Sequence, residues 1–107
     1  MKELAIIRTN LGTREQIETE LNNEGYRCYE WSDPPGAYYS PHSHQHDECI
    51  CVIIGKMSFI ISGKEYELIP GEKLYLPAGT IHESRNKGEQ RVKYLIGEKS
   101  DLNQNKR

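Results

Sequence analysis

Short apolar stretches alternate with breaks that contain glycine or proline along most of the chain. Valine, isoleucine, tyrosine and phenylalanine favour the pleated surface of a strand, whereas glycine and proline end it. This pattern predicts strands at 3–8, 26–31, 48–54, 57–62, 65–68, 73–76, 81–86 and 91–96. It predicts turns at 33–36, 63–64, 70–71 and 87–88. Short strands at such close spacing are typical of an antiparallel sandwich or barrel, so the predicted fold class is mostly β.

One segment near the N-terminus has the period of a helix instead. Thr13 is followed three residues later by Gln16, which is the spacing of a capping box, and Gly25 is placed to end a helix in a left-handed conformation. Between Thr13 and Gly25, the apolar residues Ile17 and Leu21 are four positions apart and so share one face of a helix. We therefore expect one short helix over about 14–24, packed by a thin apolar stripe against the wall of the barrel.

The length of 107 residues is that of one domain. Mean hydropathy is low, at −0.79, but the apolar residues concentrate between positions 50 and 96, where we expect the core. The sequence therefore predicts a single domain over 1–107. Its expected parts are an N-terminal strand-and-helix arm over about 1–31, a barrel core over about 36–96 and a polar tail over 98–107.

Charge and hydropathy argue against two classes of partner. The net charge is −2 and the basic residues form no stripe, whereas nucleic-acid binding needs clustered Lys and Arg. The apolar run at 50–54 is far shorter than the ~20 residues that cross a membrane, and the run at 4–7 is too short for the core of a signal peptide. We therefore expect a cytoplasmic protein that binds neither nucleic acid nor membrane.

The three cysteines, Cys28, Cys49 and Cys51, have no spacing of a disulfide framework. Cys49 and Cys51 are two positions apart in an apolar run, so they share one face of a strand. We interpret them as small buried residues, and a redox or metal role is the alternative.

Three histidines, His42, His44 and His46, lie within five positions, and Glu48 follows. Residues two apart on an extended strand point to one face, so His42 and His44 can reach a common point. Imidazole nitrogens and carboxylate oxygens are ligands of divalent transition metals. His82, beyond a Pro-Ala-Gly break, can supply a fourth ligand from across the barrel. Histidine pairs also occur on surfaces without a metal, so this cluster alone leaves both interpretations open.

The wider spacing of glycines and histidines is more specific. Two sets of fixed positions occur in order along the chain. The first set is Gly36, His42, His44, Glu48 and Gly55, and the second is Gly71, Pro77, Gly79, His82 and Asn86. They match the two sequence motifs of the cupin superfamily at every fixed position, and the chain therefore resembles a small single-domain cupin.

The resemblance implies a fold, a metal site and an assembly. The fold is a double-stranded β-helix, or jelly-roll barrel, with one short N-terminal helix. One divalent transition metal (Fe, Mn, Ni, Zn or Cu) is expected to be held by His42, His44, Glu48 and His82. Asn86 is expected to have a structural hydrogen-bonding role, and His46 lies outside the motif, as a loop or pocket-rim residue or as an alternative ligand or acid–base group. A homodimer is expected, in which the strand at 3–8 can add to a partner's sheet.

Four protein ligands leave two positions on a six-coordinate ion for water, oxygen or a chelating substrate. The first functional hypothesis is a small metalloenzyme, a dioxygenase or an isomerase, that acts on a small oxygen-rich molecule. Its candidate pocket aromatics are Trp31, Tyr38 and Tyr39, each of which core or interface packing would also explain. The alternative is a non-catalytic module that binds a metal and a small ligand for sensing or storage. A fold does not decide between these hypotheses.

Overall fold

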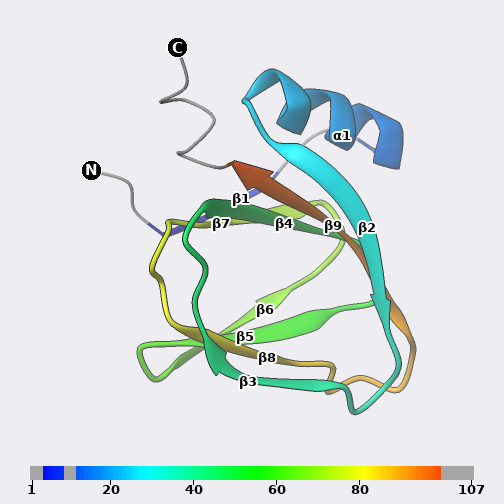
Figure 1. Cartoon of the computed structure of the whole chain (residues 1–107). Coiled ribbons are helices and arrows are strands. Elements are labelled where there is room, and N and C mark those ends of the chain that lie inside the picture. Colours follow the sequence, from blue (N-terminus) through cyan, green and yellow to red (C-terminus); the bar gives the residue numbers. More distant parts are fainter. Residues whose placement is uncertain (1–3, 9–11, 100–107) are drawn as a thin grey trace.

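Two antiparallel sheets face each other, and one helix lies on the outside of the larger sheet (Figure 1). The computed structural model describes residues 4–8 and 12–99. Within them the elements are β1 (Ala5–Arg8), α1 (Arg14–Asn23), β2 (Arg27–Asp33), β3 (Tyr38–His42), β4 (Asp47–Ile54), β5 (Met57–Ile61), β6 (Lys64–Leu68), β7 (Glu72–Leu76), β8 (His82–Arg85) and β9 (Val92–Lys99). The fold is a mostly β jelly roll with one helix, as the sequence predicts.

The larger sheet has the strand order β1-β7-β4-β9-β2, and the smaller has the order β3-β8-β5-β6. Strand β4 is buried on both faces along most of its length, because α1 covers one face of its sheet and the second sheet covers the other. A strand that is buried on both faces has no polar side to present. This arrangement explains why β4 has a continuous apolar run rather than an alternating pattern.

The two faces of the larger sheet contribute to two separate apolar clusters. The cluster between the sheets consists of Ile50, Val52, Met57, Phe59, Ile61, Leu68, Leu74, Leu76, Val92 and Tyr94. The cluster beneath the helix consists of Ile17, Leu21, Tyr26, Cys49, Cys51 and Leu95. Alternate residues of β4 therefore stabilise the barrel and attach the helix to it.

Both ends of α1 are closed as the sequence predicts. The Thr13 hydroxyl accepts from the Gln16 backbone N–H at 3.0 Å, and the Gln16 side chain accepts from the Thr13 backbone N–H at 3.1 Å. At the other end Gly25 has a φ of 99°, and Tyr26 N–H donates to the carbonyl of Leu21 at 2.9 Å. This bond belongs to a Schellman motif, in which only glycine takes the left-handed position without steric cost.

Replacing Thr13 with alanine is expected to lower the free energy of unfolding by about 1 kcal/mol, because the capping bond is lost. Chemical denaturation measures this difference. Thr19→Ala, at an exposed position of the same helix, is the control and is expected to change stability by less than about 0.5 kcal/mol. Equal stability of the Thr13→Ala variant and the parent chain would contradict the capping role.

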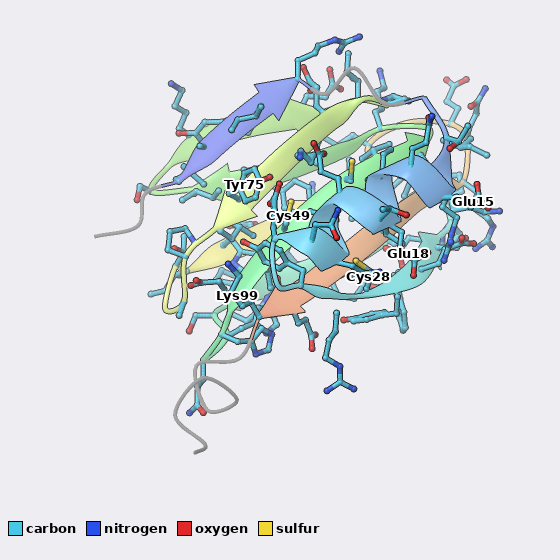
Figure 2. All side chains as sticks on the ribbon, turned by 90° about the horizontal axis from the view of Figure 1, so that it is seen from above. Glu15, Glu18, Cys28, Cys49, Tyr75 and Lys99 are labelled. Carbon is cyan, nitrogen blue, oxygen red and sulfur yellow. The ribbon has the colours of Figure 1, made fainter. Side chains whose placement is uncertain are left out.

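The prediction that the cysteines are small buried residues is confirmed for Cys49 and Cys51, whose residues are 0% exposed. Figure 2 shows Cys28 and Cys49 beside the helix, and all three cysteines are free thiols. Burial raises the pKa of the Cys51 thiol from its ordinary 9.0 to about 11, and it raises the pKa of Cys49 further. Their surroundings therefore favour the neutral thiol.

Cys49 and Cys51 are expected to resist alkylation by iodoacetamide at pH 8 while the protein is folded, and to react rapidly after unfolding. Because unfolding releases thiols with an ordinary pKa, the stability contributed by Cys51 is present below pH 9 and is lost as the pH rises through about 11. Mass spectrometry of labelled protein and denaturation at pH 8 and pH 10 measure the two effects. Labelling of the native protein within minutes would contradict the prediction.

Several element boundaries differ from the predictions. Strand β2 continues to Asp33, where we expected a turn, because the Asp33 carboxylate is buried and accepts hydrogen bonds from neighbouring aromatic side chains. Strand β5 ends at Ile61, and the turn is Ser62-Gly63 rather than 63–64, with positive φ at both residues. Strand β9 continues to Lys99, so Glu98 belongs to the barrel and not to a polar tail. Residues 100–107 of that predicted tail lie outside the described part.

Strand β3 was not predicted, because its sequence is polar and contains Pro41. It is an edge strand of the smaller sheet, where a proline does not interrupt a ladder on both sides.

The N-terminal strand was predicted over 3–8, and its described part, β1, pairs with β7 of the same chain. β1 is also an edge strand of the larger sheet, and the expected homodimer stays a prediction. No helix of the described residues is long and apolar enough to cross a membrane.

Candidate metal centre

The candidate histidines come together next to the first residues of β4. His42 is the last residue of β3, and His82 is the first of β8, directly opposite it in the antiparallel register. His44 lies in the loop after β3, so the prediction that it shares a strand face with His42 was wrong. The loop nevertheless brings the ring of His44 close to those of His42 and His82, because the chain turns back there to enter β4.

Three of the four predicted ligands form one tight group. Each of His42, His44 and His82 contributes one ring nitrogen to this group, and the three nitrogens lie within 4.8 Å of one another. The ring centroids of His42 and His82 are 4.4 Å apart, and those of His42 and His44 are 5.0 Å apart. Three imidazoles at such distances can bind a single ion.

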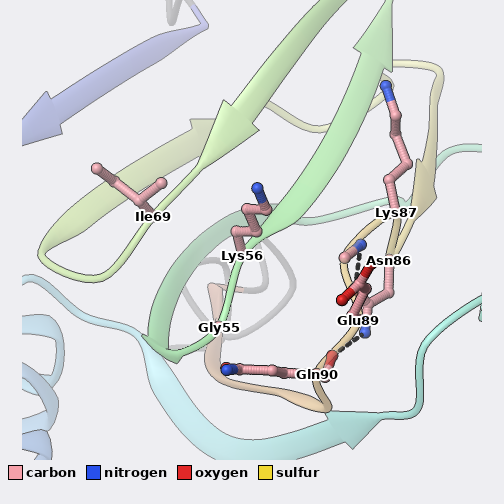
Figure 3. Close-up of a pocket in the computed structure, with 8 residues that line it drawn as sticks. Gly55, Lys56, Ile69, Asn86, Lys87, Glu89 and Gln90 are labelled. Carbon is pink, nitrogen blue, oxygen red and sulfur yellow. Dashed lines mark hydrogen bonds between the residues drawn. The ribbon is translucent and has the colours of Figure 1, made fainter.

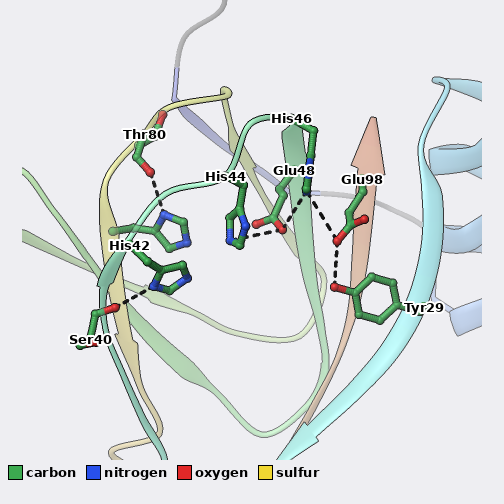
Figure 4. Close-up of polar contacts among 9 residues, drawn as sticks. Tyr29, Ser40, His42, His44, His46, Glu48, Thr80 and Glu98 are labelled. Atoms are coloured by element: carbon green, nitrogen blue, oxygen red, sulfur yellow. Dashed lines mark hydrogen bonds and ion pairs between the residues drawn. The ribbon is translucent and has the colours of Figure 1, made fainter. Parts of the chain in front are cut away.

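Backbone carbonyls fix the orientation of two of these rings (Figure 4). The Nδ1 of His42 lies 2.7 Å from the carbonyl oxygen of Ser40, and the Nδ1 of His82 lies 2.9 Å from that of Thr80. A carbonyl oxygen only accepts, so in both rings Nδ1 carries the proton and Nε2 keeps its lone pair. Histidines that bind metals usually donate their other ring N–H in this way.

Glu48, the fourth predicted ligand, lies beside this group rather than within it. Its carboxylate is almost fully buried, and its Oε2 is 3.6 Å from the Nε2 of His44. The same oxygen is 3.6 Å from the Nε2 of His46, and the mutual group that contains Glu48 consists of His44, His46 and Glu48. The structure therefore places Glu48 between the three-histidine group and His46.

The electrostatics of the cluster disfavour added protons and uncompensated negative charge. Burial lowers the pKa of His44, and the neighbouring rings of His42 and His82 lower it further. Burial also lowers the pKa of His82, against the opposite effect of its bond to Thr80. Burial raises the pKa of Glu48, and the nearby His46 acts in the opposite direction. A cation at this place would relieve both effects, since it binds neutral imidazole and stabilises carboxylate.

A small cavity of about 180 Å³ adjoins the histidines. Its lining consists of Tyr29, Trp31, Tyr39, His42, His44, Glu48, Ile50, Phe59, His82, Ser84, Tyr94 and Ile96. Two of the expected pocket aromatics, Trp31 and Tyr39, are among them. Tyr38 is not, because adjacent residues of a strand point to opposite faces, and its hydroxyl instead donates to Glu83 on the outside at 2.9 Å.

A buried carboxylate organises the aromatic side of this cavity. The Tyr94 hydroxyl donates to Asp33 Oδ2 at 2.5 Å, and the Tyr39 hydroxyl donates to Asp33 Oδ1 at 2.6 Å. The indole N–H of Trp31 donates to the same Oδ1 at 3.2 Å. The Tyr39 oxygen in turn accepts from the indole N–H of Trp31 at 3.1 Å, so Asp33 and the three aromatic side chains form one hydrogen-bonded group in the lining of the cavity.

Comparison with known proteins assigns the family. The family model described as a cupin domain matches residues 29–97, which is more than half of the chain. This chain belongs to the cupin family. The match includes both candidate motifs and strands β3 to β8, together with most of β2 and β9. No curated protein matches the sequence significantly.

Solved structures share the fold of this cupin at low sequence identity. A cupin 2 domain-containing protein from Halorhodospira halophila has a TM-score of 0.68 and 17% identity, over 94% of this chain and 80% of that one. A predicted oxalate decarboxylase from Thermotoga maritima has a TM-score of 0.64 and 20% identity, over 92% and 82%. A DMSP lyase structure has a TM-score of 0.63 and 22% identity over 70% of this chain, which spans only 38% of that longer one.

Three residues of this cupin that the sequence did not indicate lie at or next to the site, on β2 and β9. Glu98, Tyr29 and Tyr94 approach the site from strands whose pairing the sequence does not reveal. His46 was noted, but its position between two carboxylates was not predicted. Alternation on β9 was the available signal, because Val92, Tyr94, Ile96 and Glu98 share the inner face of that strand.

A larger cavity of about 550 Å³ lies at the other end of β4 (Figure 3). It is lined by Gly55, Lys56, Ile69, Asn86, Lys87, Gly88, Glu89 and Gln90. Asn86 has the structural role that the resemblance implied, since its Nδ2 donates to the carbonyl of Gln90 at 2.9 Å and its Oδ1 accepts from the N–H of Gly88 at 3.0 Å. The two lysines that line this cavity, Lys56 and Lys87, form ion pairs with glutamates of β6. No group of candidate metal ligands faces this cavity among the described residues.

Proposed function

We propose that this cupin binds one divalent transition metal through His42, His44, Glu48 and His82, and that it is a small metalloenzyme. The convergence of three histidine nitrogens, two of them with Nδ1 held by a backbone carbonyl, carries the proposal. Glu48 lies next to this group, with its Oε2 at 3.6 Å from the Nε2 of His44, and is the proposed fourth ligand. Fe, Mn, Ni, Cu and Zn all accept such ligands.

When bound, the metal supplies Lewis acidity or redox chemistry at its open coordination positions. The chain's own residues prepare the place for it. The carbonyls of Ser40 and Thr80 hold two imidazoles in one tautomer, and the apolar cluster around Phe59 keeps water from the inner side of the cavity. Asp33 accepts hydrogen bonds from Tyr39 and Tyr94 and so orients two of the aromatic side chains that line the cavity.

The cavity limits the substrate to a small molecule. A volume of about 180 Å³ holds roughly half a dozen to a dozen water molecules. None of its described lining residues is Lys or Arg, so we expect a bound metal to balance the negative charge of a ligand. A small oxygen-rich molecule that chelates the metal, such as a hydroxy acid, a keto acid or an enediol, fits these limits. The description of the Thermotoga maritima structure, a predicted oxalate decarboxylase, names a substrate of this size and chemistry.

Metal analysis of the protein as isolated tests the proposal, followed by oxygen-uptake and product assays of protein loaded with Fe²⁺, Mn²⁺, Ni²⁺, Cu²⁺ or Zn²⁺. We expect metal-dependent turnover of a small hydroxy acid, keto acid or enediol by at least one loaded form. Saturable binding of such a ligand without turnover, whichever metal is loaded, would instead support a sensing or storage module. Protein that binds none of these metals would contradict both functions.

A further inference from the structure

Strand β1 forms one edge of the larger sheet. It is the first strand in the order of that sheet, and among the described residues it pairs with β7 alone. Figure 2 shows it as the blue arrow at the margin of the sheet. The backbone N–H and C=O groups on the outer side of an edge strand are available to pair with another strand. This edge is therefore a place where a second chain can add to the barrel.

The other three edge strands have features that oppose such pairing. Strand β3 contains Pro41, which has no N–H to donate, and its register shifts before His42. Three of the five residues of β6 are charged. On β2, Arg14 of the helix binds Glu30 at 2.7 Å. Prolines, irregular register, charges and covering elements all protect an edge from another strand.

The side chains of β1 are instead apolar, except at its last residue. Ile6 is 38% exposed and Ile7 is 48% exposed. The charge of Arg8 is paired with Glu72 of β7 at 3.8 Å. Next to the strand is a cavity of about 540 Å³, which is lined by Ala5, Ile7, Glu24, Tyr26, Asp47, Tyr75, Leu76, Pro77 and Lys99. The edge and the largely apolar surface beside it together resemble the surfaces to which an additional strand binds.

The two faces of β1 decide how a second copy of the chain can pair with it. Ala5 and Ile7 line the cavity, whereas Leu4 packs on the other face, against the cluster between the sheets. Directly opposite residues of an antiparallel pair lie on the same face of the sheet. With Ile6 opposite its own counterpart, Ile7 lies opposite Ala5 and both faces match. This register pairs all of residues 4–8, and it keeps the two Arg8 side chains at opposite ends of the pair.

We propose that β1 is a homodimer interface, at which two copies pair antiparallel about a two-fold axis with Ile6 opposite Ile6. The two five-stranded sheets then form one continuous sheet. The small side chain of Ala5 leaves room at the cavity for Ile7 of the second copy, and the same contact occurs twice by symmetry. The homodimer expected from the sequence thereby has a specific interface, which contains none of the proposed metal ligands. Because the strand is short, we expect a dissociation constant of about 10–100 μM.

Sedimentation velocity of the full-length chain over about 1–500 μM, with a chelator present to prevent association through metal, tests the dimer. We expect a reversible monomer–dimer equilibrium in the parent chain and at least a 10-fold higher dissociation constant in Ile7→Asp. Ile54→Asp, at a position of β4 that is 52% exposed, is the matched control and keeps the parent equilibrium. Circular dichroism and thermal unfolding verify that each variant is folded.

Disulfide cross-linking tests the register in a Cys28→Ser background, where the remaining two cysteines are buried. Opposite Cα atoms of an antiparallel pair lie about 4.5–5.5 Å apart, within the range of a disulfide. We therefore expect Ile6→Cys to form a covalent dimer when diamide, which takes up two electrons and two protons, oxidises the two thiols. Ile7→Cys is the control, because its two thiols lie on a diagonal of about 7–8 Å and are expected to cross-link much more slowly.

Three results would overturn the proposal. A parent chain that stays monomeric at the highest concentration would exclude the dimer. A dimer that Ile7→Asp leaves unchanged, without cross-linking of Ile6→Cys, would place the interface on another surface. Faster cross-linking of Ile7→Cys than of Ile6→Cys would exclude the proposed register. None of these results bears on metal binding, so the failure of this proposal is distinguishable from that of the proposed function.

Discussion

His82→Ala is expected to weaken metal binding at the three-histidine group by at least about 100-fold. Loss of an outer partner of a metal ligand already costs 10–100-fold in affinity, and loss of the ligand itself costs more. His82 is buried, and its Nδ1 is held by the Thr80 carbonyl, so the variant loses an Nε2 whose position the protein fixes. Competition with a chromophoric chelator measures the affinity for Ni²⁺ or Zn²⁺.

The control for this experiment is a change at the same strand that leaves the ligands intact. Arg85→Ala, an exposed position of β8, is expected to keep the parent affinity for the metal. Equal affinity of His82→Ala and the parent chain would contradict the assignment of His82 as a ligand. Equal loss in both variants would mean that disturbance of β8, and not the missing imidazole, lowers the affinity.

Leu74→Ala is expected to reduce the free energy of unfolding by about 2–5 kcal/mol. Leu74 is 0% exposed and lies in the cluster between the sheets, on a strand that is paired on both sides. Paired backbone on both sides prevents the neighbouring strands from closing the cavity that the alanine leaves. Since domains of this size are stable by only about 5–15 kcal/mol, the loss is a large share of the total.

Urea denaturation of parent and variant measures the change, with Ile81→Ala as the control. Ile81 is 65% exposed, so its truncation is expected to change stability by less than about 0.5 kcal/mol. Similar stabilities of the two variants would contradict the position of the core between the sheets. Metal-free protein is needed for both measurements, because a bound ion adds its own contribution to stability.

The elements that the sequence predicts best are those whose cause is local. The capping box at Thr13 and the left-handed Gly25 depend on a few neighbouring residues, and both are found in the structure. The apolar run of β4 identified a buried strand, because both of its faces are covered. Glycines of the two motifs occupy left-handed positions, and a Cβ at Gly55 would lie only 3.0 Å from the carbonyl oxygen of Arg91.

What the sequence left out depends on contacts between distant residues. Tyr94 and Asp33 are 61 positions apart, and only the pairing of β2 with β9 brings their side chains together. Glu98 was expected in a polar tail, because its position opposite Glu48 in the sheet follows only from the pairing of β4 with β9. The polar strand β3 carries no pattern of its own, since its edge position does not require apolar residues on both faces. Local patterns do not contain these relations.

The candidate ligands also differ in which sheet they belong to. His42 and His82 are on strands of the smaller sheet, whereas Glu48 is the second residue of the central strand of the larger one. An ion bound by all of them would connect the two sheets at the mouth of the barrel, as a covalent cross-link would. At a free metal concentration 1,000-fold above the dissociation constant, this ion would increase the free energy of unfolding by about 4 kcal/mol. Stripping the ion would then loosen the mouth first, so amide hydrogen exchange in β3 and at the start of β4 would report metal loading without any substrate.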